Sequence, residues 1–210
     1  MQKIKKKLII FDFDGVIIDS KKNMFLSWLA VQKKLQTRIS FNKYFQNIGI
    51  PFEKILKKIQ FYKSFLEAKI IYEKTSEKHL NKIYLFKDVK RTLNFLLRNY
   101  TLCLVTSKNK NRTKKILKKL KIIKNFKHVY CPEDRFPSKP NSKVVKYLKK
   151  KYKLKNSEIL IVGDTNHDKT FAKNANVNFL YANYGYGKLK SKYKIKLFKE
   201  LKNFLIRKNF

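Results

Sequence analysis

The sequence predicts an α/β protein built on an open, mostly parallel sheet, with a helical cap inserted into it. Two observations carry this prediction. Short apolar runs alternate with segments of helical periodicity along most of the chain, and residues 20–82 contain helical patterns but no clear strand. Strands that alternate with helices form parallel sheets, because each helix carries the chain back to the starting edge of the sheet. The 210 residues, 43% of them hydrophobic, suffice for one core and a smaller insert.

Each predicted strand is a short apolar run bounded by polar residues. The strands are expected at residues 7–13, 100–107, 126–132, 157–165 and 177–183. Between and after them, apolar side chains recur every three or four positions, which is the spacing of one helix face. Helices are therefore expected at residues 89–99, 111–123, 142–152, 167–175 and 196–208.

The inserted region carries helical patterns at residues 23–35 and 52–74. We expect the chain to divide into a catalytic core of residues 1–19 and 83–210 and a cap of residues 20–82. The helical pattern of the cap is interrupted only by "NIGIPFE" at residues 47–53. Its glycine and proline predict a loop, which we expect to reach the site, with Asn47 or Lys54 as candidate substrate contacts.

Composition bounds the partners. The net charge of +38 could indicate binding to nucleic acid, but only six of the 52 cations are arginine and the lysines are spread from end to end. Readers of DNA sequence favour arginine on one face, so we expect no specific nucleic-acid binding and attribute the charge to lysine-rich composition. The N-terminal apolar run is too short for a signal peptide, and no run approaches a membrane span. Cys103 and Cys131 lack metal-ligand or disulfide spacing, and we expect a cytoplasmic protein without membrane association.

Polar side chains follow the predicted strands at the edge where ligands bind in open α/β sheets. They are Asp12 and Asp14 after the first strand, Thr106 and Ser107 after the second, Lys139 in the loop after the third, Asp164 after the fourth, and Asp168 four residues later. Carboxylates from two strand ends can share Mg²⁺, and one of them can attack phosphorus. A second carboxyl group can transfer the proton, and a lysine and a hydroxyl can stabilise the phosphoryl oxygens. The set therefore points to phosphoryl transfer.

Four motifs occur in the order "DFDGVIIDS", "LVTS", "SKP" and "IVGDTNHD", and "YGYG" follows at residues 184–187. In these motifs the chain resembles the haloacid dehalogenase-like superfamily, specifically phosphatases of the phosphoglycolate phosphatase type. The resemblance implies a Rossmann-like core with a helical cap and a Mg²⁺-dependent phosphatase that acts on a small phosphorylated metabolite as a monomer or dimer.

The resemblance also implies a role for each motif residue. Asp12 would be the nucleophile and Asp14 the general acid and base, and the presence of Asp14 places the chain with the phosphatases rather than the dehalogenases. Thr106, the Ser107 backbone and Lys139 would bind the phosphate. Asp12, the carbonyl of Asp14 and Asp164 would hold Mg²⁺, and Asp168 would orient a metal-bound water or the lysine.

Three departures from the usual motifs touch no reacting group. Val16 stands where threonine is common, "KPNS" replaces the usual "KPxP", and Asn176 stands where glycine is common. Asp19 and Ser20 lie where the chain enters the cap, and we expect a hinge or helix-start role for them.

Alternatives remain for the same residues. A calcium loop starting at Asp12 would need glycine and glutamate where Ile17 and Asn23 stand, which excludes an EF-hand. The motif at Asp164 could be a helix N-cap. At the level of function, a phosphomutase of the same superfamily and a catalytically retired basic binding module are the alternatives.

Overall fold

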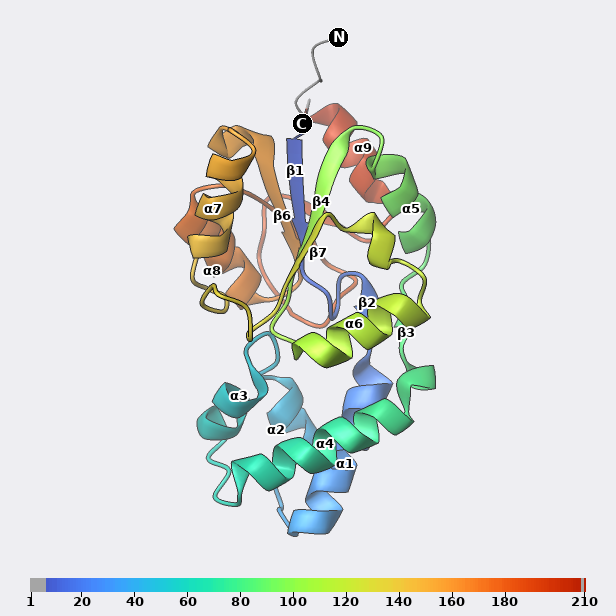
Figure 1. Cartoon of the computed structure of the whole chain (residues 1–210), viewed down its shortest axis with the longest axis vertical. Helices are drawn as coiled ribbons and strands as arrows, with labels where there is room; N and C mark the ends of the chain where they lie inside the picture. Colours follow the sequence, from blue (N-terminus) through green and yellow to red (C-terminus); the bar gives the residue numbers. More distant parts are fainter. Residues whose placement is uncertain (1–6, 209) are drawn as a thin grey trace.

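The structure, a computed structural model, describes residues 7–208 and 210 and has the predicted parallel sheet (Figure 1). The six strands lie side by side in the order β5 (His128–Tyr130), β4 (Tyr100–Val105), β1 (Lys7–Phe11), β6 (Ile159–Gly163), β7 (Asn178–Ala182) and β8 (Lys194–Ile195). All neighbouring strands run parallel. The first six residues of the predicted core and residue 209 lie outside the described residues.

Both faces of the sheet are buried, because alternate residues of β1 enter different apolar layers. Ile9 and Phe11 pack with α5 (Val89–Leu96), α6 (Lys110–Lys119) and α9 (Glu200–Arg207). Leu8 and Ile10 pack with α7 (Lys143–Lys151) and α8 (Asn166–Ala175) on the other face. Single turns of 3-10 helix complete the connections, as η1 (Leu80–Lys82), η2 (Ile123–Asn125) and η3 (Asn156–Glu158). The three layers confirm the α/β prediction.

Four helices lie beyond the carboxyl ends of the strands and form a separate apolar cluster (Figure 1). They are α1 (Lys21–Leu35), α2 (Phe41–Phe45), α3 (Phe52–Lys58) and α4 (Phe65–Lys78). Trp28 is buried at the centre of the cluster, where its ring stacks on Tyr44 with centroids 4.5 Å apart and its indole N–H donates to the carbonyl of Ile39. We propose that these helices are the cap, because they carry a hydrophobic cluster of their own.

The prediction of one continuous helical pattern over residues 52–74 was wrong, because two separate helices, α3 and α4, occupy this region. The chain turns between α3 and α4, where Gln60 has a φ of 56° and Ser64 caps α4 by accepting a hydrogen bond from the Glu67 N–H. A serine N-cap starts a new helix because it satisfies one of the free N–H groups of the first turn.

Two short strands that the sequence did not predict join the cap to the core. β2 (Ile18–Asp19) pairs antiparallel with β3 (Tyr84–Leu85), and Ile18 lies opposite Leu85. The chain therefore leaves the core and returns to it at neighbouring points, which supports the proposed division at residues 20–82. Within the part of the chain that the structure describes, no helix combines the length and apolar character that crossing a membrane requires.

Candidate active site

Asp12 is held at the carboxyl end of the central strand β1. Its backbone N–H donates to the carbonyl of Val162 at 2.9 Å, so the pairing with β6 continues one residue beyond the strand. The side chain is buried, and its Oδ1 lies 2.5 Å from Nζ of the equally buried Lys139. The sheet thus fixes the carboxylate in position and the lysine fixes its orientation.

Three buried carboxylates gather around this point, as their sequence positions predicted. Asp164 follows β6 directly and Asp168 lies in the first turn of α8, and each offers an oxygen within 4.8 Å of one on Asp12. Lys139 also reaches Asp168, with Nζ 2.7 Å from Oδ1. One ammonium group therefore faces three carboxylates, and of the two partners expected for Asp168, a metal-bound water or the lysine, the lysine is in contact with it.

Electrostatics show how crowded these charges are. The pKa of Asp12 is raised to about 7. Burial is the largest cause, the charges of Asp168 and Asp14 act in the same direction, and Lys139 only partly opposes them. The pKa of Asp164 is raised well above its usual value by burial and by the charges of Asp168 and Asp12. Burial disfavours the ammonium of Lys139, but the two carboxylates that it contacts outweigh burial and raise its pKa.

The residues fit a divalent cation. Oδ1 of Asp164 is buried and has no hydrogen-bond partner among the residues that the structure describes, whereas its Oδ2 accepts from the Tyr186 N–H at 2.7 Å. Two full charges 4.8 Å apart repel by about 3.5 kcal/mol at an effective dielectric constant of about 20. A single lysine does not offset three such carboxylates, and a cluster of carboxylate oxygens suits Mg²⁺.

Gly15 lets the loop after β1 pass close to this cluster. Its φ of 85° lies in the left-handed region, and a Cβ there would lie 2.1 Å from Oδ2 of Asp164. Both constraints favour glycine. The "DFDG" motif therefore ends in glycine because the chain turns directly against a carboxylate from a different strand.

Asp14 occupies different surroundings although it lies only two residues from Asp12. It is half-buried, its Oδ1 accepts from the Ser20 hydroxyl, and the same oxygen lies 3.1 Å from Nζ of Lys108. The Lys108 side chain is buried, and burial lowers its pKa against the opposing charge of Asp14. The sequence did not predict Lys108, because one lysine among 46 carries no signal.

Thr106 and Ser107, from the predicted phosphate-binding set, follow β4, which neighbours β1 on the side away from β6 and Asp164. Thr106 is buried, its N–H donates to the carbonyl of Tyr130 at 3.0 Å, and its hydroxyl oxygen accepts from the Lys108 N–H at 3.1 Å. Ser107 turns its hydroxyl away to donate to the carbonyl of Gly49 at 2.8 Å. The side chain of Ser107 thus contacts the cap, and phosphate binding by its backbone N–H stays a prediction.

The predicted loop of residues 47–53 does reach the site, since residues 48–53 line the pocket above Asp12 and Asp14. The choice of Asn47 or Lys54 as the substrate contact was wrong, because neither residue lines the pocket. Lys54 is exposed on α3.

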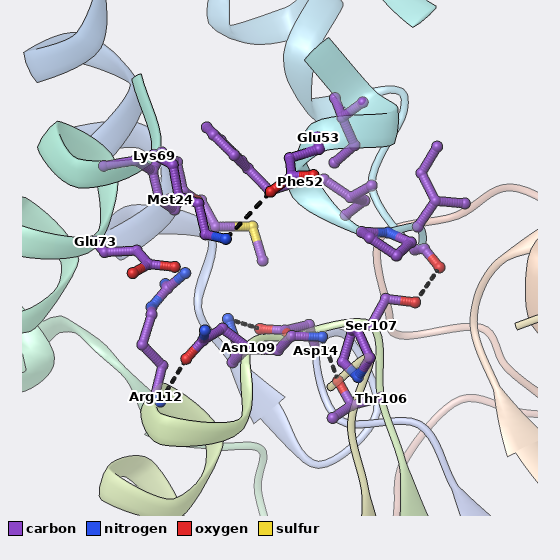
Figure 2. A pocket seen from close by; sticks show the side chains of 18 of the residues that line it. Asp14, Met24, Phe52, Glu53, Lys69, Glu73, Thr106, Ser107, Asn109 and Arg112 are labelled. Atoms are coloured by element: carbon purple, nitrogen blue, oxygen red, sulfur yellow. Dashed lines mark hydrogen bonds and ion pairs between the residues drawn. The ribbon is translucent and has the colours of Figure 1, made fainter. Parts of the chain in front are cut away.

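The pocket between cap and core has a volume of about 240 Å³. Figure 2 shows Asp14 and Thr106 on one side, and Met24, Phe52 and Lys69 from the cap facing them. The ammonium of Lys69 bridges to Glu53 at 3.1 Å and so joins α4 to α3 above the pocket.

Arg112 forms a further part of the pocket wall and comes from α6 of the core. Its guanidinium lies over the ring of Tyr72, 5.2 Å from the centroid, and donates to the Ser76 hydroxyl at 2.5 Å. Figure 2 shows it extending toward Glu73 of the cap. Sequence reasoning missed Arg112 and Lys69, because helix-face cations in a lysine-rich chain look alike until the cap is folded over them.

The alternative reading of Asp164 as a helix N-cap is wrong. Thr165 is the N-cap of α8, and it forms a capping box with Asp168, whose Oδ2 accepts from the Thr165 N–H at 3.1 Å and from its hydroxyl at 2.6 Å. Asp168 therefore uses one carboxylate oxygen for the helix start and the other for Lys139. Asp164 is left to face the carboxylate cluster.

Comparisons with known proteins agree with this geometry. Residues 9–182 match the sequence profile described as haloacid dehalogenase-like hydrolase. A phosphoglycolate phosphatase from Aliivibrio fischeri is 29% identical over 195 residues, which cover 86% of this chain and 85% of the relative. A pyrophosphatase PpaX from Oceanobacillus iheyensis is 27% identical over 172 residues, covering 81% of this chain and 80% of that protein.

A solved structure has the same fold over nearly the whole chain. The haloacid dehalogenase-like family hydrolase from Streptococcus pneumoniae superposes with a TM-score of 0.83 at 21% identity. The match covers 97% of this chain and 100% of that one, so the helices beyond the sheet are included.

Proposed function

The chain belongs to the haloacid dehalogenase-like hydrolase family and is a phosphatase of that family. From this premise we propose that it hydrolyses a small phosphorylated metabolite with Mg²⁺ through an aspartyl-phosphate. The observation that carries the proposal is the position of Asp12. Its buried carboxylate lies at the floor of the pocket, with Lys139 bonded to one oxygen and Thr106 among its neighbours in the pocket lining. A nucleophile, a proton-transfer group and phosphate-binding groups therefore converge on one cavity.

In the first step, a carboxylate oxygen of Asp12 attacks phosphorus and the bond to the leaving oxygen breaks. Asp14 gives its proton to that oxygen, so the product leaves as an alcohol. Lys139, the Thr106 hydroxyl and the Ser107 N–H stabilise the negative charge on the transferring oxygens.

In the second step, Asp14 takes a proton from water, whose oxygen attacks phosphorus. The bond between phosphorus and Asp12 breaks, and inorganic phosphate and the free carboxylate result. Asp12, the Asp14 carbonyl and Asp164 would hold Mg²⁺, and the bound cation would supply positive charge to balance the carboxylates and the phosphate. Asp168 holds Lys139 in place throughout.

The size of the pocket favours a small substrate. Its volume of about 240 Å³ is below the roughly 300–1,000 Å³ of sites that enclose drug-sized ligands. Among the expected substrates, a compound of the size of phosphoglycolate or a small sugar phosphate fits this space better than a nucleotide. The names of the two relatives add phosphoglycolate and pyrophosphate to the panel that we would screen first.

The central test is the Asp12→Asn variant with p-nitrophenyl phosphate and Mg²⁺. We expect hydrolysis to fall to the background rate, because an amide oxygen does not form the phosphoenzyme. Excess EDTA should remove the activity of the unchanged enzyme, and circular dichroism should show that the variant is folded. Full activity of the variant, or turnover unaffected by EDTA, would contradict the proposal.

Product analysis separates the two alternatives. A phosphomutase would convert a hexose 1-phosphate to its isomer, whereas the proposed phosphatase releases inorganic phosphate. A retired binding module would turn over no phosphate ester, and the presence of Asp12 and Asp14 in one pocket, with Lys139 bonded to Asp12, argues against it. A cytoplasmic location and a monomeric or dimeric state stay predictions.

A further inference from the structure

The "YGYG" segment at residues 184–187 has no role in the reaction as described above. It follows β7 and contacts two places that matter to the site. One is the carboxylate of Asp164, and the other is the neck, by which we mean residues 16–20, through which the chain enters the cap.

The contact with Asp164 is close and made by backbone. The Tyr186 N–H donates to Oδ2 of Asp164 at 2.7 Å. A Cβ on Gly185 would lie 2.4 Å from the Asp164 side chain, and one on Gly187 would lie 2.1 Å from its carbonyl oxygen. The two glycines therefore allow the loop to lie directly against Asp164, and this fixes where Tyr186 stands.

The contact with the neck is made by the Tyr186 hydroxyl. It accepts a hydrogen bond from the Ser20 N–H at 2.6 Å and lies 3.0 Å from Oδ1 of Asp19, to which it can donate. The Tyr186 ring packs against Phe45 of α2, with centroids 5.2 Å apart. A residue of the core loop thus holds the first residue of the cap.

Ser20 carries this contact to the reacting groups. It occupies the N-cap position of α1, where serine commonly bonds the N–H groups of its own helix. Here its buried hydroxyl instead donates to Oδ1 of Asp14. A chain of contacts therefore runs from the Tyr186 hydroxyl through Ser20 to the carboxyl group proposed to transfer the proton.

We propose that Tyr186 is a positioning residue for Asp14: its hydroxyl fixes Ser20, and the Ser20 hydroxyl holds the Asp14 carboxyl group where the leaving oxygen is protonated. This inference rests on the proposed function. Asp12 is held independently by Lys139 and the sheet, so loss of the Tyr186 hydroxyl should impair proton transfer and spare nucleophilic attack.

The test uses two aryl phosphates that differ in their need for the proton. Phenol has a pKa of about 10, like the tyrosine side chain, so the leaving oxygen of phenyl phosphate departs more readily when it receives a proton. p-Nitrophenolate is a much weaker base and leaves without one. Tyr186→Phe should lower kcat/KM for phenyl phosphate by about tenfold, part of the roughly 10²–10⁴-fold that general acid–base catalysis supplies. For p-nitrophenyl phosphate the loss should stay below about twofold.

Tyr184→Phe is the matched control. The Tyr184 hydroxyl comes from the same loop and donates at 2.9 Å to the carbonyl of Val16 in the same neck, but it does not contact Ser20. Its ratio of the two kcat/KM values should equal that of the unchanged enzyme. Ser20→Ala should shift the ratio as Tyr186→Phe does, and the double variant should add little, because both act through Asp14.

An equal loss on both esters in Tyr186→Phe, or the same shift in the ratio for Tyr184→Phe, would overturn the inference. If Tyr186→Phe does not fold, Ser20→Ala carries the same comparison. The Mg²⁺ concentration for half-maximal rate should not change in Tyr186→Phe, because the N–H that bonds Asp164 remains. Failure of the proposed function differs from these outcomes, since it would appear as activity retained in Asp12→Asn.

Discussion

At the scale of single residues, the two aspartates of one motif differ in burial and in their neighbours. Asp12 is buried beside Lys139 and two other carboxylates, whereas Asp14 is half-buried between Ser20 and Lys108. Paired carboxyl groups with different environments are how one site separates a nucleophile from a proton-transfer group. The motif predicted both aspartates. It could not predict Lys108, because Lys108 comes close to Asp14 only in the folded chain.

The crowded carboxylates lead to a prediction for the protein in EDTA. The pKa of Asp12 is about 7 in the fold and about 3.9 in an unfolded chain, so the folded state binds more protons between these values. The free energy of unfolding should therefore fall as pH rises from about 4 to about 7, at a limit of about 1.4 kcal/mol per pH unit for one group. Added Mg²⁺ should stabilise the protein more at about pH 8 than at about pH 5, because protons compete for the same oxygens.

Urea unfolding at both pH values, with EDTA or Mg²⁺, measures these differences. The Asp12→Asn variant is the control, since it lacks one of the titrating groups and should show a weaker pH dependence in EDTA. Stability that rises with pH over this range in EDTA would contradict the prediction.

At the scale of elements, the long apolar runs were predictable and the two-residue strands were not. The strands β1, β4, β5, β6 and β7 lie inside the predicted ranges, because a buried parallel strand is a continuous apolar run. β2, β3 and β8 have two residues each, which is too short for an alternation of side chains to appear. The turn between α3 and α4 was missed for a related reason: the apolar spacing continues on both sides of it.

Helix ends in this chain often use non-glycine residues in the left-handed region. Asn176 ends α8 with a φ of 53°, and Lys121 follows α6 with a φ of 55°. Asparagine tolerates this conformation better than most residues with a Cβ, which explains why it can replace the glycine that is common at this position. Lysine has no such advantage.

Substitutions at these two ends should therefore have opposite effects. Asn176→Ala should lower the free energy of unfolding by about 1 kcal/mol, and Asn176→Gly should leave it equal or slightly higher. Lys121→Gly should raise it by about 1 kcal/mol. Thermal or urea unfolding measures each change, and a gain in stability for Asn176→Ala would contradict the account of the helix end.

At the scale of the whole molecule, acidic residues gather at the pocket that we propose as the active site. Five of the 14 acidic residues line the pocket, although the chain carries a net charge of +38. They are Asp12, Asp14, Glu53, Glu73 and Glu133. The fold class and the placement of the motif residues were predictable, since parallel strands all bring their carboxyl ends to one edge of the sheet. The pocket wall was not, because it forms where α3, α4 and α6 come together.

The positive field of the rest of the molecule should act on substrate capture. The Debye length is about 30 Å at 0.01 M salt and about 8 Å at 0.15 M, so a diffusing phosphate ester feels the distant lysines only at low salt. We expect kcat/KM for p-nitrophenyl phosphate to fall several-fold as KCl rises through this range at constant Mg²⁺, while kcat stays nearly constant. A parallel fall in kcat would show that salt acts on the chemistry instead.

The pairing of β2 with β3 has a consequence for how the chain could be re-engineered. Antiparallel strands can be closed by a turn of two residues, and Asp19 and Tyr84 stand opposite each other at the end of this pair. Residues 20–83 thus occupy the place of a hairpin turn. A short turn in their place that keeps Ser20 beside Asp14 would leave the register of the six-stranded sheet intact, so different lids could be joined to the same core.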